Sequence, residues 1–274
     1  MQFGFVVPWG NARTVADMAH EAEQVGWDAI FVWEPVWGID AWVCLTAAAM
    51  RTERIKLGTM ITPLSRMRPW KLASETATLD NLSGGRVILG VGLGAIDVGF
   101  AEFGEETDRK IRAELMDEGL DILTGLWRGQ PFQFHGKHYK IEPFDRIGAQ
   151  PLIQEPRIPI WMIGAGGSNK SMNRVAKYDG LLPNVITQGE PTRAATPAEL
   201  KPMVLDVLSR RTTSTPFDVI VEGETPGDDP TESAEILQPW RNAGATWWLE
   251  AMWSAEGPAG HDRVRARLRQ GPPR

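Results

Sequence analysis

Residues 82–94, LSGGRVILGVGLG, form a short apolar run that ends in three alternate glycines. A turn at residues 83–85 leads into the apolar residues 87–89, and Gly90, Gly92 and Gly94 follow. A run of this kind is typical of a parallel strand that is buried on both faces. The glycines have three interpretations: a dinucleotide-binding fingerprint, a tight bend, or the close approach of a flat ring to bare backbone. The fingerprint is the weakest, because residues 95–104 (AIDVGFAEFG) stand where its helix should begin.

Strand and helix patterns alternate along the chain around this stretch. Besides the quoted stretch, which is the fourth strand, short apolar runs predict strands at residues 3–7, 28–34, 54–63, 158–164, 180–185, 217–223 and 246–253. Amphipathic patterns predict helices at residues 14–25, 42–50, 69–82, 110–127, 171–178, 197–211, 231–243 and 261–269. Thr14 is expected to cap the first of these helices. Eight such units predict one (β/α)8 TIM barrel over residues 1–274, with a doubly wound sheet as the competing fold.

The connection between the fourth and fifth strands is longer than the others. Residues 95–157 hold more than one helix, and residues 131–144 (PFQFHGKHYKIEPF) alternate in polarity around Gly136. This pattern predicts a small hairpin or extended flap. We therefore expect the barrel to carry an insertion between strands 4 and 5.

Composition excludes several classes of protein. The net charge of −6 argues against nucleic-acid binding, which needs a basic patch. The single cysteine, Cys44, excludes an internal disulfide, and no run approaches the roughly 18 apolar residues of a membrane span. The first residues, MQFGFVVPWG, lack the basic start of a signal peptide. The expectation is a soluble cytoplasmic protein.

In a barrel of this type the active site lies at the C-terminal ends of the strands. The sequence places few charges there, chiefly Glu34, Glu222 and Glu224, and it places four tryptophans that we predict to line a substrate pocket: Trp9, Trp33, Trp37 and Trp253. No metal site is predicted, because the histidines lack the three or four converging ligands that zinc needs. A mouth with few acid–base groups predicts that the chemistry comes from a cofactor.

A glycine-rich turn follows the fifth strand. Residues 163–171, IGAGGSNKS, end a strand, turn on small residues and open a helix at Ser168–Ser171. Backbone N–H groups at such a helix start bind phosphate, and glycines let the oxygens approach closely. We favour a phosphate site over an ordinary strand–helix turn.

Four blocks together resemble the bacterial luciferase-like monooxygenase superfamily, which includes deazaflavin-dependent oxidoreductases. They are TERIKLGTMITPL (52–64), ETATLDNLSGGRVILGVGLG (75–94), ELMDEGLDILTGLWRG (114–129) with the FHGKHYKIEPF that follows, and IPIWMIGAGGS (158–168). Their order and spacing carry the resemblance, which runs over nearly the whole chain.

The resemblance implies a barrel that binds FMN, or alternatively a deazaflavin coenzyme (F-420), at its C-terminal mouth. It also implies a bulge at Met60–Ile61, where such proteins often carry a non-proline cis peptide, and a ring lying on the glycines of the fourth strand. By position, the cofactor-binding residues would be Met60, Ile61, Thr62, Leu93, Gly94, Ala165, Gly166, Gly167 and Ser168.

The chain departs from the family pattern at two places. Family members often have an acid followed by histidine after the second strand, whereas here Glu34 is followed by Pro35. Glu34 could still act as the catalytic hydrogen-bond partner or proton donor. Ala95 stands where the deazaflavin sugar-phosphate dehydrogenases carry a glutamate, and the basic residues for a sugar phosphate lack clear equivalents. We therefore expect a less polar substrate.

The main functional hypothesis is an oxidoreductase, a monooxygenase that uses reduced FMN from a separate flavin reductase to oxidise an apolar small molecule. The alternative is hydride transfer with a deazaflavin, in which oxygen plays no part. A second alternative is a flavin-binding protein without turnover, and a third is a cofactor-free hydrolase that uses Glu34 with Glu222 or Glu224. The resemblance also makes a homodimer plausible.

Overall fold

Eight parallel strands close into a barrel in the computed structural model, which describes residues 1–129, 131–144, 151–187 and 192–274. Hydrogen bonding joins these eight strands in chain order, and the last pairs with the first. They are β1 (Gln2–Val7), β2 (Ala29–Val32), β3 (Lys56–Thr59), β5 (Val87–Gly92), β8 (Ile160–Gly166), β9 (Gly180–Val185), β11 (Asp218–Gly223) and β12 (Trp247–Glu250). The ring confirms the predicted TIM barrel over the doubly wound sheet.

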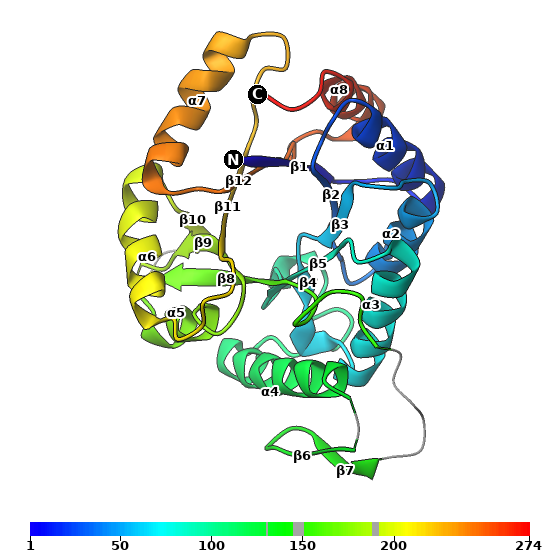
Figure 1. Ribbon diagram of the computed structural model, residues 1–274, viewed down its shortest axis with the longest axis vertical. Helices are drawn as coiled ribbons and strands as arrows, with labels where there is room; N and C mark the ends of the chain where they lie inside the picture. The colour runs from blue at the N-terminus through cyan, green and yellow to red at the C-terminus, as the bar shows by residue number, and fades with distance from the viewer. Residues whose placement is uncertain (130, 145–150, 188–191) are drawn as a thin grey trace.

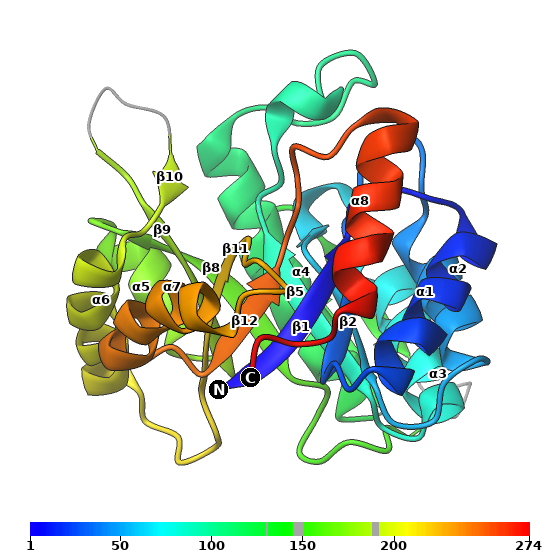
Figure 2. The same cartoon turned by 90° about the horizontal axis from the view of Figure 1, so that it is seen from above.

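Helices surround the barrel, with α5, α6 and α7 on one side and α1, α2, α3 and α8 on the other (Figures 1 and 2). Their bounds are α1 (Ala12–Gln24), α2 (Ala41–Ala49), α3 (Pro69–Ser83), α4 (Arg109–Trp127), α5 (Asn169–Val175), α6 (Pro197–Arg210), α7 (Pro230–Ala243) and α8 (Gly257–Arg269). The described part of the chain has no helix with the length and apolarity needed to cross a bilayer.

Aromatic side chains fill the interior of the barrel. Trp161 lies between Phe31 and Trp247, with ring centroids 5.4 Å and 5.1 Å apart, and none of the three rings is more than 2% exposed. These rings pack with aliphatic side chains from β1, β5, β9 and β11 into one inner cluster, separate from the larger cluster between strands and helices. Because the interior is packed rather than hollow, the position left for ligands is the C-terminal mouth.

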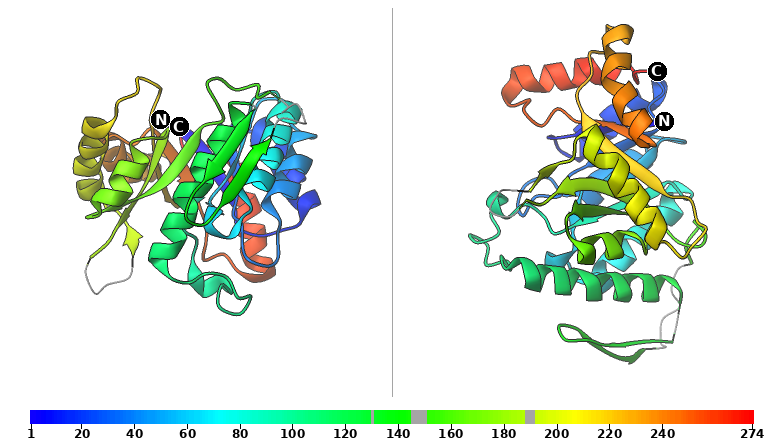
Figure 3. Two further views of the ribbon diagram at one scale, coloured as in Figure 1. Left: turned by 90° about the horizontal axis from the view of Figure 1, so that it is seen from below. Right: turned by 90° about the vertical axis from the view of Figure 1, so that its left-hand side faces the viewer.

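The insertion between β5 and β8 holds α4 and an antiparallel hairpin, β6 (Phe132–His135) and β7 (Lys140–Phe144). Figure 3 shows the hairpin standing outside the barrel, beyond α4. The turn contains Gly136, as the sequence predicts. One side chain of α4 binds the backbone of the hairpin turn, because Glu118 accepts hydrogen bonds from the N–H groups of residues 137–139.

Two of the local differences between the prediction and the structure have a clear structural cause. The strand predicted at 54–63 is divided into β3 and the two-residue β4 (Thr62–Pro63), which pairs with β5 farther along. The cap of α1 is Asn11, not Thr14, and the Asn11 side chain accepts the Thr14 N–H at 3.0 Å. Asparagine is at least as good a cap as threonine, and it begins the helix two residues earlier than predicted.

Candidate active site

The bulge between β3 and β4 forms one wall of the mouth. The peptide bond Met60–Ile61 is cis, as the resemblance implied, and both side chains are half-buried. Beneath them Thr62 donates a hydrogen bond to the Thr59 hydroxyl at 3.1 Å. That hydroxyl in turn lies 3.2 Å from both the N–H and the carbonyl oxygen of Gly90. The bulge is therefore tied to β5 and presents two apolar side chains to the mouth.

The three glycines of β5 make room for the protein itself. A Cβ atom at Gly90 would lie 2.2 Å from the Thr59 carbonyl oxygen, and one at Gly92 would lie 2.4 Å from Ile61 Cδ1. Gly94 has a φ of +79°, a backbone conformation that glycine adopts readily. The close neighbours of Gly90 and Gly92 are thus Thr59 at the end of β3 and Ile61 of the bulge, so close packing of the chain itself accounts for these two glycines. A ring lying at this strand end stays a prediction.

Glu34 lies two residues after the end of β2, and its carboxyl group is partly buried. Its Oε2 atom is buried and has no hydrogen-bond partner in the described part of the chain. Burial raises the pKa of Glu34 to about 7, although the positive charge of Arg66 opposes this shift. The Arg66 guanidinium donates to the carbonyl oxygens of Glu34 and Pro35, at 3.1 Å and 2.6 Å. Glu34 can therefore hold or release a proton near neutral pH.

The turn after β8 supplies free backbone donors. Ser168 caps α5, and the Ser171 hydroxyl accepts the Ala165 N–H at 2.9 Å, which orders the turn. Gly167 has a φ of +87°. In the described residues no protein acceptor is seen for the N–H groups of residues 167, 169 and 170, as is usual in a first helical turn. These groups are available to an anion.

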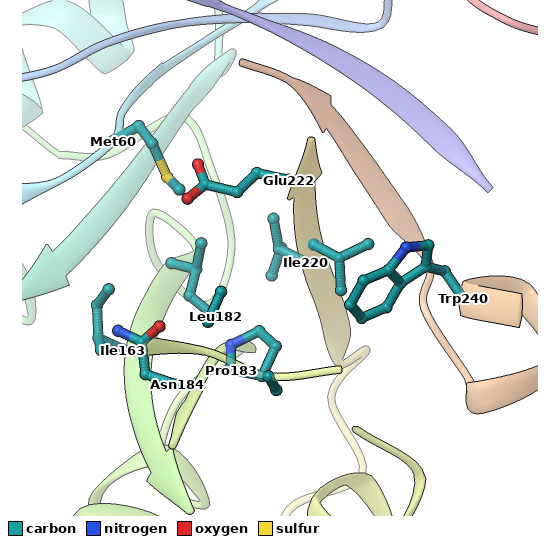
Figure 4. Close-up of a pocket in the computed structure, with 11 residues that line it drawn as sticks. Met60, Ile163, Leu182, Pro183, Asn184, Ile220, Glu222 and Trp240 are labelled. Carbon is teal, nitrogen blue, oxygen red and sulfur yellow. The ribbon is translucent and has the colours of Figure 1, made fainter. Parts of the chain in front are cut away.

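A pocket opens between β8, β9 and β11, beside the bulge (Figure 4). Its walls are mainly apolar, and Met60, Ile163 and Trp240 are among them. Two polar side chains, Asn184 and Glu222, also line it, and Figure 4 shows the Glu222 carboxylate opposite Met60. Over the described ranges, no three His, Cys, Asp or Glu side chains gather as metal ligands would.

The family model of the luciferase-like monooxygenases matches residues 1–201. The chain belongs to this family. An F420-dependent glucose-6-phosphate dehydrogenase of Amycolatopsis mediterranei is 34% identical over 178 residues, which cover 61% of this chain and 50% of that protein. The chain spans about half the length of the curated relatives it matches.

Two solved structures share the fold of this luciferase-like chain. One is an F420-dependent secondary alcohol dehydrogenase in complex with an F420–acetone adduct, with a TM-score of 0.76 and 18% identity. The other is the coenzyme F420-dependent tetrahydromethanopterin reductase of Methanopyrus kandleri, with a TM-score of 0.75 and 19% identity. Each comparison covers 98% of both chains. At such identities the likeness shows the fold alone.

The luciferase-like fold brings the predicted cofactor residues to one end of the barrel. Met60 and Ile61 lie on the bulge, Leu93 and Gly94 follow β5, and residues 165–168 end β8 and form the turn after it. Two of the predicted residues lie below the surface: Thr62 is fully buried, and Ala165 is 4% exposed. These two hold neighbouring loops in place, whereas the others are partly open to the mouth. Direct cofactor contact stays a prediction for all of them.

The four tryptophans predicted for the pocket of this luciferase-like barrel take different positions. Trp9 stacks on His261 with ring centroids 3.7 Å apart, and Trp33 donates its indole N–H to the Pro8 carbonyl at 2.8 Å. Trp253 is 43% exposed and donates to Glu222 at 3.2 Å, so it borders the pocket. Trp37 is 82% exposed and lies on the rim rather than in a closed pocket.

Sequence reasoning missed two arginines that hold the mouth of this luciferase-like barrel together. Arg66 binds the loop after β2, as described above, and Arg112, 6% exposed, donates to the carbonyl oxygens of Leu93 and Gly94 at 2.8 Å and 3.1 Å. The sequence pattern could have identified Arg112, because this residue lies one helical turn before Met116 on the apolar face of α4. A charge on an apolar face indicates a buried polar partner.

Proposed function

We propose that this chain is an oxidoreductase that transfers a hydride between a deazaflavin coenzyme (F-420) and a small organic molecule. The F420-dependent relative matched over 178 residues carries this choice. It favours the deazaflavin alternative over the reduced-FMN monooxygenase that the sequence analysis put first. A separate flavin reductase then has no role. A cytoplasmic location and a homodimer belong to the same proposal.

The residues at the mouth fit a cofactor of this shape. The half-buried side chains of Met60 and Ile61 offer an apolar surface for a flat ring. The free N–H groups after Gly166 offer donors for a phosphate, and the exposed Lys170 adds positive charge beside them. FMN shares both features, so the fit supports the class of cofactor and the relatives support the choice within it.

Glu34 supplies the acid–base group of the proposal. A bound deazaflavin supplies the hydride chemistry, and the protein has to move the proton that accompanies it. Glu34 keeps a proton at a buried carboxyl oxygen with a pKa of about 7, which suits proton exchange at neutral pH. Because Pro35 follows it in place of histidine, Glu34 works without a neighbouring imidazole.

A paired titration tests the proposal. The protein is titrated by calorimetry with the deazaflavin and with FMN, each oxidised and reduced. We expect the deazaflavin to bind at least tenfold more tightly. Tighter binding of reduced FMN would restore the monooxygenase hypothesis, and binding of neither would contradict every flavin hypothesis.

Turnover separates an enzyme from a binding protein. Reduction of the deazaflavin by a panel of alcohols, and its reoxidation by enones, is followed by absorbance. We expect Glu34→Gln to lose at least a hundredfold in rate while it binds the coenzyme as the wild type does. Glu224→Gln, a change at an exposed carboxylate, should leave both unchanged. Tight binding with no turnover on any substrate would point to the flavin-binding alternative.

A further inference from the structure

The wall of the barrel is split between β9 and β11. The two strands pair at Gly180–Asp218 and Leu181–Val219, and the described pairing ends there. Toward the mouth β9 continues with Pro183, which has no N–H to donate. The last part of β9 pairs instead with the short β10 (Arg193–Ala194). Beyond Leu181, β9 therefore pairs with β10 instead of β11, and residues 220–222 of β11 have no described ladder partner on that side.

The pocket beside the bulge lies in this split. Ile220 belongs to the inner cluster of the barrel and Val221 to the outer one, so the pocket, which both residues line, reaches through the wall. Trp240 of α7 closes its outer side, and Figure 4 shows the indole ring beside β11. Met60 lies at its inner end, so the pocket and the proposed cofactor surface share a side chain.

The polar group of this pocket is the carboxyl of Glu222. Its Oε2 atom accepts the Trp253 indole N–H at 3.2 Å, and the described residues provide no ion pair for it. Among the residues that the structure describes, no lysine or arginine lines the pocket. A phosphate or carboxylate placed there would meet a carboxylate without a neutralising cation, which is unfavourable in an apolar pocket. The pocket therefore selects against anionic molecules.

Burial raises the pKa of Glu222, because the apolar walls disfavour its charged form. A cation would have to lose its own hydration to enter the same walls. A hydroxyl group suits the pocket better, because it donates to a carboxylate and accepts from a protonated carboxyl group. An ammonium group only donates, and a ketone only accepts.

We propose that the split between β9 and β11 is the substrate pocket and that it takes an uncharged, mostly apolar alcohol, with its hydroxyl group on Glu222. This assignment rests on the proposed hydride transfer, since it names the substrate class of the same site. The alcohol's apolar body lies against Ile163 and Trp240. Glu222 holds the hydroxyl oxygen and determines specificity, and Glu34, the acid–base group of the proposed function, takes the hydroxyl proton as the hydride leaves the carbon.

Four probes with one common ring test the proposal. Cyclohexanol, cyclohexylamine, cyclohexanone and cyclohexanecarboxylate are titrated into the coenzyme-free protein at pH 7, and binding is followed by NMR. We expect cyclohexanol to bind at least tenfold more tightly than the other three. Equal or tighter binding of the amine, the ketone or the carboxylate would overturn the assignment, and so would a failure of all four to bind.

Substitutions in the pocket test which residue causes the preference for cyclohexanol. Glu222→Leu should lower cyclohexanol affinity about tenfold, because the hydrogen bond is lost, whereas Glu222→Gln should retain it within threefold. Glu224→Leu, at an exposed site just after β11, is the matched control and should change nothing. Trp240→Ala should weaken all four probes alike, which gives a second result if Glu222→Leu does not fold. A preference that survives Glu222→Leu would contradict the assignment.

The two proposals fail separately. The probe titrations contain no coenzyme, so cyclohexanol binding with no deazaflavin binding would remove the proposed function and leave the pocket. Deazaflavin binding with no preference for cyclohexanol would remove the pocket and leave the proposed function.

Discussion

The carboxyl group of Glu34 lies in surroundings that disfavour its ionised form. Its free Oε2 atom is buried, and the nearby Arg66 guanidinium is bound to backbone carbonyl oxygens rather than to the carboxylate. Burial is the larger effect on its pKa and the Arg66 charge is the smaller one. The group is thus poised for proton transfer, and the fold loses stability whenever it is ionised.

The pH dependence of stability follows from this pKa. The folded-state value of about 7 lies above the ordinary 4.5, so the stabilisation from the neutral carboxyl is complete below pH 4.5 and is lost as the pH rises through 7. We expect Glu34→Gln, which stays neutral, to raise the free energy of unfolding relative to wild type by up to about 3 kcal/mol at pH 8 and by little at pH 4.5. Urea unfolding at both pH values measures this difference. Glu224→Gln is the control, and a difference that does not change with pH would contradict the raised pKa.

The glycines of β5 show how a single residue type can have several causes. The sequence pattern is the same at Gly90, Gly92 and Gly94, yet a side chain at the first two would collide with Thr59 and Ile61, and the third has a left-handed backbone conformation. Neither cause can be read from the neighbouring residues in the sequence. The partners Thr59 and Ile61 lie about 30 residues away in the chain.

At the scale of elements, a single carboxylate of α4 binds the backbone of the turn of the hairpin β6–β7. Glu118 accepts the N–H groups of Lys137, His138 and Tyr139 at 2.6, 2.9 and 3.0 Å. The hairpin has two strands, which is too few for independent stability. It is therefore held in place by α4 rather than by its own pairing.

Removal of that carboxylate should release the hairpin and spare the barrel. We expect Glu118→Ala to lower the amide hydrogen-exchange protection of residues 137–139 at least tenfold, because hydrogen bonds to a charged acceptor are worth about 1.5–3 kcal/mol. Glu114→Ala is the control, since Glu114 contacts only the side chains of Lys137 and His138. Exchange protection in β1 and β12 should not change. Loss of protection throughout the chain would show that the hairpin supports the barrel.

At the scale of the whole molecule, a buried ion pair joins α8 to the last strands of the barrel. Glu250, fully buried at the end of β12, accepts the N–H of Thr225 at 2.7 Å and an N–H of Arg267 at 3.3 Å. Arg267 also donates to the Thr225 carbonyl at 2.8 Å. Because β12 pairs with β1, this network lies where the barrel closes.

We expect Arg267→Ala to lower the free energy of unfolding by about 3–5 kcal/mol, since it leaves a buried carboxylate without its cation. Arg269→Ala, on the same helix, removes a more exposed pair with Glu21 and should cost less than about 1 kcal/mol. Urea unfolding measures both. The double variant Arg267→Met with Glu250→Leu should recover part of the loss. A loss below about 1 kcal/mol for Arg267→Ala would contradict the role of the pair.

The sequence by itself determined the barrel, the insertion and the family. Apolar strands, amphipathic helices and turn glycines are local signals in the sequence. Eight repeats of one strand–helix pattern are compatible with only a few fold topologies. It also placed Glu34, the bulge and the glycine turn at strand ends. In a (β/α)8 barrel the C-terminal ends of all the strands lie on one face, so these residues were expected at one mouth.

Only the tertiary structure decided how these residues act. The pKa of Glu34, the anchoring of loops by Arg66 and Arg112, and the split beside Glu222 all depend on contacts between segments distant in the chain. Burial and charge depend on every atom that surrounds a group, and those atoms come from several strands and helices at once. A linear pattern identifies a strand end, but only the folded chain sets the electrostatic surroundings of the side chain that stands there.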